Sequence, residues 1–184
     1  MIAYLPSESS KSMYSGSSPK FFFQSFVTEH SIGLMTEYTP VTAGSYRRRL
    51  GSQPLVKIFV SNEDSNASKM FNRFGDFARR NPKQLFTFAD ISKNRQDVEE
   101  FKVEAGGYVI ETADTQYVKR GVDISTSTLE EFLKEFVAGT AQPYVKSEEI
   151  PASNDGPVTV VVGKTFDSLV TNVDKDVLLE FYAP

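Results

Sequence analysis

The sequence predicts an α/β fold, with a mixed central sheet flanked by helices on both faces. Apolar runs of strand length, such as residues 55–60 and 84–89, alternate with stretches whose apolar residues recur at helical spacing. A hairpin signal and a closing helix follow this alternation, between residues 108 and 139. Alternating strands and helices form a parallel core, and a hairpin adds antiparallel strands to it.

Composition is ordinary for a globular domain with additional chain. The 184 residues are 40% hydrophobic and 24% charged. The net charge of −4 argues against a nucleic-acid binder. Arg47-Arg48-Arg49 is the only run of three basic residues, and a solvated helix face explains it more simply than an anion site. No apolar run reaches the roughly 18–20 residues that a membrane span requires.

The first expected helix begins at Ser18-Pro19, where serine can cap the helix and proline suits its first position. Its apolar face consists of Phe22, Phe23, Phe26 and Val27. Gly33 ends this helix, and residues 34–38 follow as a strand. Pro40 then opens a short helix that runs to Leu50 and ends at Gly51.

The middle of the chain predicts two buried strands and two helices. Residues 55–60 form the first strand, and a helix over 65–80 follows, ended by Asn81-Pro82 because proline disfavours helix in the residue before it. The inner stripe of that helix consists of Met70, Phe71, Phe74, Phe77 and Ala78. Residues 84–89 form the next strand, and 95–103 a further helix.

The last part of the domain predicts a hairpin and a closing helix. Gly106-Gly107 precedes the hairpin, whose strands are expected within residues 108–119. The helix is expected to open with a capping box, formed by Ser127 and Glu130. Gly139 is its expected end.

One hexapeptide occurs twice in altered form. Residues 23–28, Phe-Gln-Ser-Phe-Val-Thr, return as residues 166–171, Phe-Asp-Ser-Leu-Val-Thr. Each copy runs into an apolar stretch that ends on Tyr-small-Pro, at Pro40 and at Pro184. A helix followed by a strand therefore occurs twice, about one small domain apart. We expect the chain to be a piece of a longer tandem protein, cut within the second copy.

The stretch from Val158 to Pro184 resembles the start of the second catalytic domain of the protein disulfide isomerase family. It begins Val-Thr-Val-Val-Val-Gly-Lys-Thr-Phe and ends Val-Leu-Leu-Glu-Phe-Tyr-Ala-Pro. In that family, such a proline is followed by the redox motif Trp-Cys-Gly-His-Cys. Residues 143–151, Pro-Tyr-Val-Lys-Ser-Glu-Glu-Ile-Pro, resemble the family's linker into that domain. The resemblance implies a thioredoxin-like fold.

The resemblance also implies a division of the chain. Residues 19–142 would be the non-catalytic thioredoxin-like domain called b-prime, and residues 143–157 the linker. Residues 158–184 would be the truncated start of a catalytic thioredoxin domain. Residues 1–18 are either the tail of a preceding domain or a segment foreign to it.

The resemblance implies that the b-prime domain is redox-inactive. When this domain is aligned with the family's catalytic domains on Pro40, Thr42 and Ser45 occupy the two cysteine positions. A hydroxyl cannot act as a thiolate. Ala105-Gly106-Gly107 stands where the family has a cis-proline. The chain contains no cysteine, which excludes a disulfide, a thiolate nucleophile and a thiolate metal site. We therefore expect no catalytic residue and no cofactor.

Binding of unfolded or partly folded polypeptides in an apolar cleft is the function that the resemblance leaves to such a domain. The candidate positions are Tyr46, Leu50, Val56, Ile58, Phe74 and Phe77. The last four lie at regular core spacings, so an ordinary core role is the alternative for them. Fifteen Phe and eight Tyr residues would supply sequence-tolerant contact area for such a site.

The C-terminal part of the chain carries two further expectations. Val145 and Ile150 are expected to fold back over the cleft and to compete with peptide. The apolar runs 158–162 and 177–181 are expected to be strands buried on both faces. Alone they would expose their faces and edges, so we expect them to pair, with a homodimer through residues 158–184 favoured over docking within one chain.

Other chemistry has little support in the sequence. His30 is the only histidine, and without cysteine it makes a zinc site very improbable, so we expect no metal. We therefore expect a non-catalytic, polypeptide-binding part of a protein disulfide isomerase from the lumen of the endoplasmic reticulum. The alternative is a calcium-storage or scaffold protein built from tandem thioredoxin folds. Such a protein would have dense acidic tails, whereas this chain balances 24 acidic against 20 basic residues.

Overall fold

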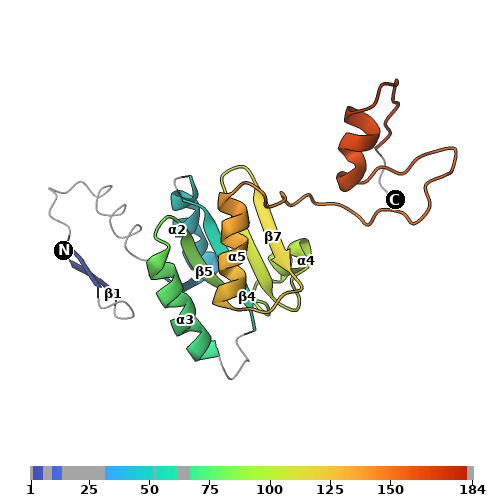
Figure 1. Ribbon diagram of the computed structural model, residues 1–184. Helices are drawn as coiled ribbons and strands as arrows, with labels where there is room; N and C mark the ends of the chain where they lie inside the picture. Colours follow the sequence, from blue (N-terminus) through green and yellow to red (C-terminus); the bar gives the residue numbers. More distant parts are fainter. Residues whose placement is uncertain (1, 6–9, 14–31, 52, 62–66, 182–184) are drawn as a thin grey trace. The chain divides into compact units, whose positions relative to one another are not determined.

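The computed structural model describes residues 2–5, 10–13, 32–51, 53–61 and 67–181. These residues form two compact units, Met1–Pro143 and Tyr144–Pro184, and each is described by itself (Figure 1). The helix expected from Ser18-Pro19 lies outside the described residues. A small antiparallel hairpin of β1 (Ile2–Leu5) and β2 (Ser10–Met13) occupies a region for which the sequence predicted no element.

A five-stranded mixed sheet forms the centre of the first unit, as the sequence predicted. Its strands, in spatial order, are β3 (Thr36–Glu37), β5 (Leu85–Asp90), β4 (Leu55–Val60), β6 (Gly107–Glu111) and β7 (Gln116–Arg120). β3, β5 and β4 run parallel, whereas β6 and β7 are antiparallel to their neighbours. The expected strand at 34–38 is reduced to two residues at one edge of the sheet.

Helices cover both faces of this sheet (Figure 1). α3 (Ala67–Arg80) and α5 (Thr126–Val137) lie on one face, and α2 (Pro40–Leu50) and α4 (Arg95–Phe101) on the other. None of the helices among the described residues is long and apolar enough to cross a membrane. The side chains of β4 alternate between the two layers, as they must in a strand. Val56 and Ile58 join the layer of α3 and α5, while Leu55 joins the layer of α2.

The capping of α5 differs from the prediction. Ser125, not Ser127, is the N-cap: its backbone is extended and its side chain accepts a hydrogen bond from the Thr128 N–H at 3.2 Å. Ser127 therefore lies within the first turn of the helix. Gly139 adopts a left-handed φ of 71°, which confirms the expected end of the helix.

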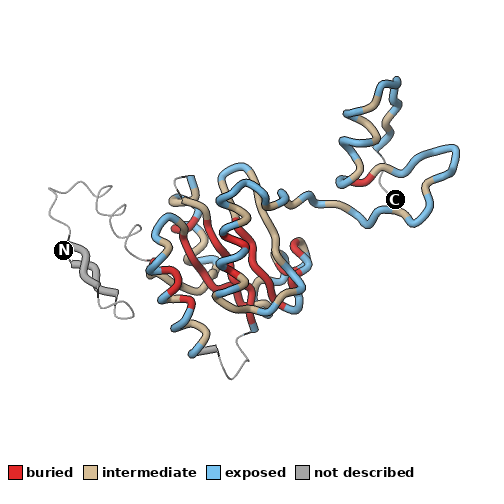
Figure 2. Tube along the Cα trace, in the orientation of Figure 1, coloured by how far each residue is buried: buried red, intermediate tan, exposed pale blue. Residues whose placement is uncertain are grey.

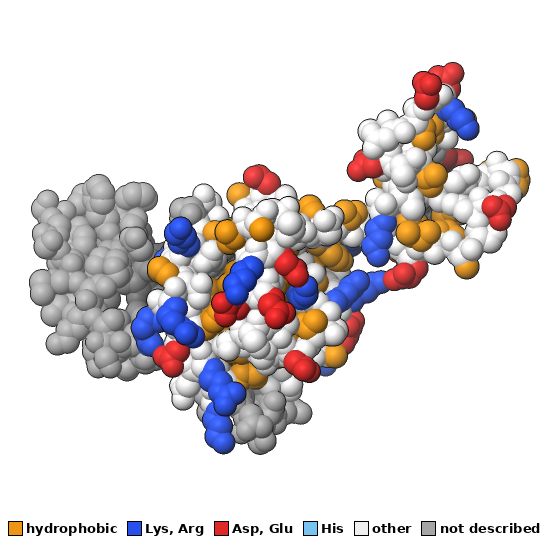
Figure 3. Space-filling view, viewed as in Figure 1, with side chains coloured by type: hydrophobic (Ala, Val, Ile, Leu, Met, Phe, Trp, Pro, Cys, Tyr) orange, Lys and Arg blue, Asp and Glu red, His pale blue; other side chains and the backbone are white. Residues whose placement is uncertain are grey.

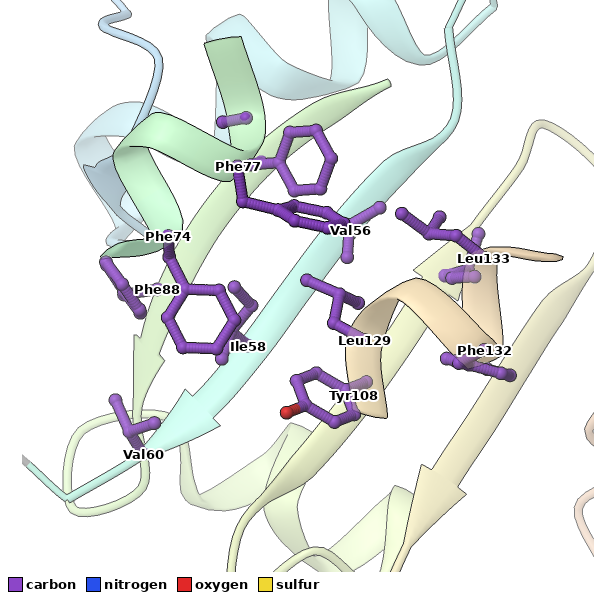
Figure 4. Close-up of a cluster of buried hydrophobic side chains, with 13 residues drawn as sticks. Val56, Ile58, Val60, Phe74, Phe77, Phe88, Tyr108, Leu129, Phe132 and Leu133 are labelled. Atoms are coloured by element: carbon purple, nitrogen blue, oxygen red, sulfur yellow. The ribbon is translucent and has the colours of Figure 1, made fainter. Parts of the chain in front are cut away.

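The core of the domain lies between the sheet and the layer of α3 and α5. Figure 2 shows the central strands as the most buried part of the chain. Aromatic rings pack edge to face there: the ring centroids of Phe74 and Phe88 lie 5.8 Å apart (Figure 4). Those of Phe77 and Phe86 lie 5.9 Å apart. Such pairs add stability beyond the area they bury.

The second unit does not form the two expected strands. It contains a short 3₁₀ turn, Gly163–Thr165, and a helical turn, Asp167–Thr171. The segments 158–162 and 177–181 are irregular, and Val158, Leu178 and Phe181 are 79%, 99% and 85% exposed. A strand is stable only beside a partner strand, and the described residues of this unit provide none.

Candidate functional site

The topology corrects the position that matches the redox motif. In the family, the motif follows a strand, a helix and a second strand, which is the order that residues 158–184 resemble. In the folded domain that order is β3, α2 and β4, so the matching position follows Val60 at the end of β4. The assignment of Thr42 and Ser45 to the cysteine positions is therefore wrong. Residues 62–66, which directly follow the matching strand, lie outside the described part of the chain.

Thr42 instead lies in the first turn of α2, where it forms a capping box with Thr39, the N-cap residue. The Thr39 N–H donates to Thr42 Oγ1 at 2.9 Å, and the Thr42 N–H donates to Thr39 Oγ1 at 3.3 Å. The Thr42 hydroxyl also donates to the Glu37 carbonyl oxygen at 2.7 Å. These bonds satisfy backbone groups that a helix N-terminus leaves without partners. The role of Thr42 is structural.

The carboxyl ends of β4 and β5 form the topological switch point of the sheet, because the chain leaves β4 toward α3 and β5 toward α4, on opposite faces. Ligand sites of open α/β sheets are typical of such a point. Asp90 is buried here, and its Oδ1 accepts hydrogen bonds from the N–H and the hydroxyl of Ser92 at 2.9 and 2.8 Å. Gly106 has a φ of 93°, and a Cβ there would lie 3.1 Å from the Phe59 carbonyl oxygen. Asp90 and Gly106 therefore stabilise turns at this end of the sheet.

The six candidate peptide-binding residues do not form one cleft, because the sheet separates them into two groups. Val56, Ile58, Phe74 and Phe77 lie in the core under α3 and α5, with at most 4% exposed (Figure 4). Tyr46 and Leu50 lie on the opposite side of the sheet, on α2. A polypeptide has no access to the four core residues in this structure, so their ordinary core role holds.

Tyr46 is also buried, whereas Leu50 is partly exposed. The Tyr46 hydroxyl lies 3.3 Å from the Thr36 carbonyl oxygen and 3.2 Å from that of Phe86, as a donor to both. Burial raises the pKa of Tyr46 above its ordinary value. Leu50 and Tyr38 are half-buried and pack against the small cluster to which Tyr46 belongs. Of the six candidates, Leu50 is the one with accessible apolar surface.

Lys57 is a buried charged residue that the sequence analysis did not single out. It lies on β4 and faces the layer of α2 and α4, where its Nζ is 3.0 Å from Asp97 Oδ2 and 3.0 Å from Glu111 Oε2. Nζ also lies 4.2 Å from the centre of the Tyr38 ring. A lysine inside the run Leu-Val-Lys-Ile-Phe-Val was the available signal.

The carboxylates decide the protonation of Lys57. Burial alone lowers the pKa of a lysine, because it disfavours the charged form. The charges of Glu111 and Asp97 outweigh burial and raise the pKa of Lys57 above its usual value. Lys57 is therefore charged at neutral pH and closes an internal ion network, which leaves no amine available as a base or nucleophile.

Charged groups elsewhere on the folded domain form exposed pairs. Lys93 lies 2.8 Å from Glu37, and Lys134 lies 3.0 Å from Glu130. Figure 3 shows basic and acidic side chains interspersed over the face that it presents. Among the described residues, no group of three or more histidine or acidic side chains is placed to hold a metal ion.

Val145 and Ile150 belong to the second unit, where they are 47% and 54% exposed. Their expected return over the domain stays a prediction.

Comparison with known proteins identifies the family to which this fold belongs. Residues 1–135 match the family described as thioredoxin-like domain. The chain belongs to this family. A solved structure described as the bb fragment of ERp72 superposes with a TM-score of 0.58 at 20% identity, covering 73% of this chain and 62% of the other. At that identity the likeness shows the shared fold.

Curated relatives of this thioredoxin-like chain are protein disulfide isomerases. Protein disulfide-isomerase A4 from Mus musculus is 30% identical over 179 residues, which cover 92% of this chain and 28% of that protein. A protein disulfide-isomerase from Arthroderma benhamiae is 30% identical over 193 residues, covering 100% of this chain and 36% of that protein. The chain is of the protein disulfide isomerase type, and it spans about a third or less of these relatives.

Proposed function

We propose that this chain is a redox-inactive, polypeptide-binding part of a protein disulfide isomerase that assists folding in the lumen of the endoplasmic reticulum. The observation that carries the proposal is a thioredoxin-like domain of the isomerase type without any cysteine. Thiol–disulfide exchange requires a thiolate, so this domain cannot take part in that chemistry itself. Holding a substrate for catalytic domains is the role that remains.

The accessible surface for such binding is the α2 rim, which we define as the half-buried side chains of Tyr38 and Leu50. Both pack on the buried cluster of Ile32, Tyr46, Leu55 and Leu85, which holds them in place. An aromatic ring beside an aliphatic side chain offers contact area with little sequence preference. Because this contact is mainly apolar, binding of an unfolded polypeptide should depend little on salt.

Replacing Leu50 with lysine should weaken the binding of an unfolded polypeptide by roughly tenfold. That factor corresponds to the free energy gained when one leucine side chain is buried on binding. Folding should be nearly unaffected, since a lysine at a half-buried position keeps its charge in water. Fluorescence anisotropy with a labelled, reduced and unfolded model protein measures the affinity, and thermal unfolding measures the stability.

Val41→Lys is the matched control on the same helix. Val41 is 88% exposed and lies about two and a half turns before Leu50, which places it on the opposite side of α2. This variant should bind as the unmodified chain does. Equal affinity of Leu50→Lys and Val41→Lys would remove the α2 rim as the binding surface.

Ending the chain at Gln142 should raise the affinity for polypeptide if Val145 and Ile150 compete for the α2 rim. A Val145→Ser, Ile150→Ser variant of the full chain should raise it as well, because only the apolar side chains are changed. Light scattering on each form shows whether the masses are equal, since the exposed segment 158–181 favours self-association. Equal affinities of monomeric forms would contradict the competition.

A further inference from the structure

The outer edge of β7 has no partner strand among the described residues. β7 pairs with β6 on one side, and on the other side the described residues provide a single antiparallel bridge, Tyr117 to Pro143. The groups that bond to β6 alternate along the strand. The Thr112 N–H donates to the Thr115 carbonyl oxygen at 2.8 Å, so Thr115, Tyr117 and Lys119 turn their backbone groups toward β6.

The backbone groups of Gln116, Val118 and Arg120 therefore point away from the sheet. Those of Gln116 and Val118 flank the bridge and face the chain on either side of Pro143, whereas Arg120 lies beyond it. The charged side chains of β7 have partners elsewhere in the domain and do not block strand pairing at this edge. Lys119 is bound to Glu135 at 2.9 Å on the α5 face, and Arg120 Nη1 donates to the Phe101 carbonyl oxygen at 3.0 Å. A strand edge that no strand covers is a template for another extended chain, which here would displace the chain around Pro143.

We propose that the edge of β7 binds an extended segment of the polypeptide substrate as an additional antiparallel strand. This inference rests on the proposed polypeptide-binding function and gives it a second contact besides the α2 rim. The chain itself supplies the precedent, because Pro143 already lies against Tyr117 in antiparallel orientation. Main-chain pairing recognises any extended sequence, which suits a site for unfolded proteins.

Side chains beside the edge favour a substrate strand with apolar residues at alternate positions. On the α5 face, the Tyr117 ring lies 5.1 Å from the Phe136 ring, and both are half-buried. On the opposite face, Val118 is also half-buried. An incoming strand would place alternate side chains against these two apolar surfaces.

A reversible disulfide lock between positions 117 and 143, where the bridge is observed, tests the proposal. Tyr117 and Pro143 form a pair without mutual hydrogen bonds, because Tyr117 directs its groups to β6 and proline has no N–H. Such pairs bring Cα atoms to about 4.5 Å, within the range that a disulfide spans. The double variant Tyr117→Cys, Pro143→Cys can therefore hold the chain on its own edge when oxidised. The unmodified protein has no cysteine, so reductant affects only the variant.

The probe is a soluble peptide of alternating threonine and valine with lysines at both ends. We expect the oxidised variant to bind it at least tenfold more weakly than the same variant after reduction. An N-methylated form of the peptide, methylated at alternate residues, should bind the reduced variant at least tenfold more weakly than the parent peptide. Amide hydrogen exchange of Arg120, which lies beyond the bridge, should slow in the unmodified chain when the parent peptide is added.

Three results would overturn the strand-addition proposal. One is binding that the lock and N-methylation leave unchanged while Leu50→Lys reduces it, which would leave the proposed function intact. Another is slow exchange of Arg120 without peptide in a dimer seen by light scattering, which would make a second copy the occupant. Failure of every unfolded polypeptide to bind the unmodified chain would overturn the proposed function together with this inference.

Discussion

Replacing Phe74 with alanine should lower the free energy of unfolding of the domain by about 3–5 kcal/mol. The Phe74 side chain is buried between α3 and the sheet, and its ring packs edge to face on Phe88. Alanine would leave a cavity that the surrounding strands cannot fill, because they are fixed by their hydrogen bonds. Urea unfolding followed by circular dichroism measures the change.

Leu50→Ala is the matched comparison for Phe74→Ala. Leu50 is half-buried, so its truncation should cost the fold much less while it weakens polypeptide binding. The two variants thus separate a core residue from a surface residue among the six candidates. A stable Phe74→Ala domain with impaired polypeptide binding would show that Phe74 belongs to the binding site after all.

Lys57→Met should destabilise the domain by about 3 kcal/mol, although methionine is the more apolar side chain. The substitution leaves Asp97 and Glu111 facing each other, partly desolvated and without the cation that lies 3.0 Å from each. Lys93→Met is the control, because Lys93 is largely exposed in its pairing with Glu37, and exposed pairs contribute little. Urea unfolding at neutral pH compares the two.

The contribution of Lys57 should also depend on pH in one direction. Its pKa is higher in the folded domain than in the unfolded chain, so folding favours the protonated amine. The stabilisation is complete below the unfolded pKa of about 10.4 and is lost as the pH rises through the higher folded value. From pH 6 upward, the difference in stability between the unmodified chain and Lys57→Met should therefore stay constant and shrink only above about pH 10.4. A difference that shrinks between pH 6 and 9 would contradict this assignment.

Elements with strong periodicity could be predicted from the sequence. The strand at 55–60 and the helix at 40–50 have the predicted bounds, and the hairpin strands shift by only one residue. In these segments, local propensity, turn residues and apolar spacing favour the same structure. The first strand was predicted less well, because β3 is an edge strand whose two paired residues depend on β5.

The candidate site could not be predicted, because it depends on the order of strands in space. The chain crosses from β3 past β5 to β4 and then returns to β5. Right-handed crossovers in opposite directions place their helices, α2 and α3, on opposite faces of the sheet. Leu50 and Phe74 therefore cannot share a cleft, although both follow the apolar pattern expected of one. The misplaced redox position has a different origin: the alignment on Pro40 equated β3 with the strand that precedes the motif, whereas the matching strand is β4.

The segments 158–162 and 177–181 show a second limit of sequence reasoning. Their composition predicts strands, and β4, which has a similar composition, is fully buried between two neighbours. The two segments have no partner strand among the described residues, and most of their side chains remain exposed. Strand formation is a property of the pair, so it requires residues that the pattern does not contain.

Lys57 makes β4 intolerant of misalignment during folding. The other side chains of β4 are apolar, so a one-residue shift against β5 and β6 would still bury apolar groups in both layers. That shift would turn Lys57 toward the apolar core that includes Phe74 and Leu129. A buried ammonium without a partner costs several kcal/mol, so the misaligned sheet is excluded. The single charge in the strand thereby selects one alignment from several that hydrophobic burial alone would accept.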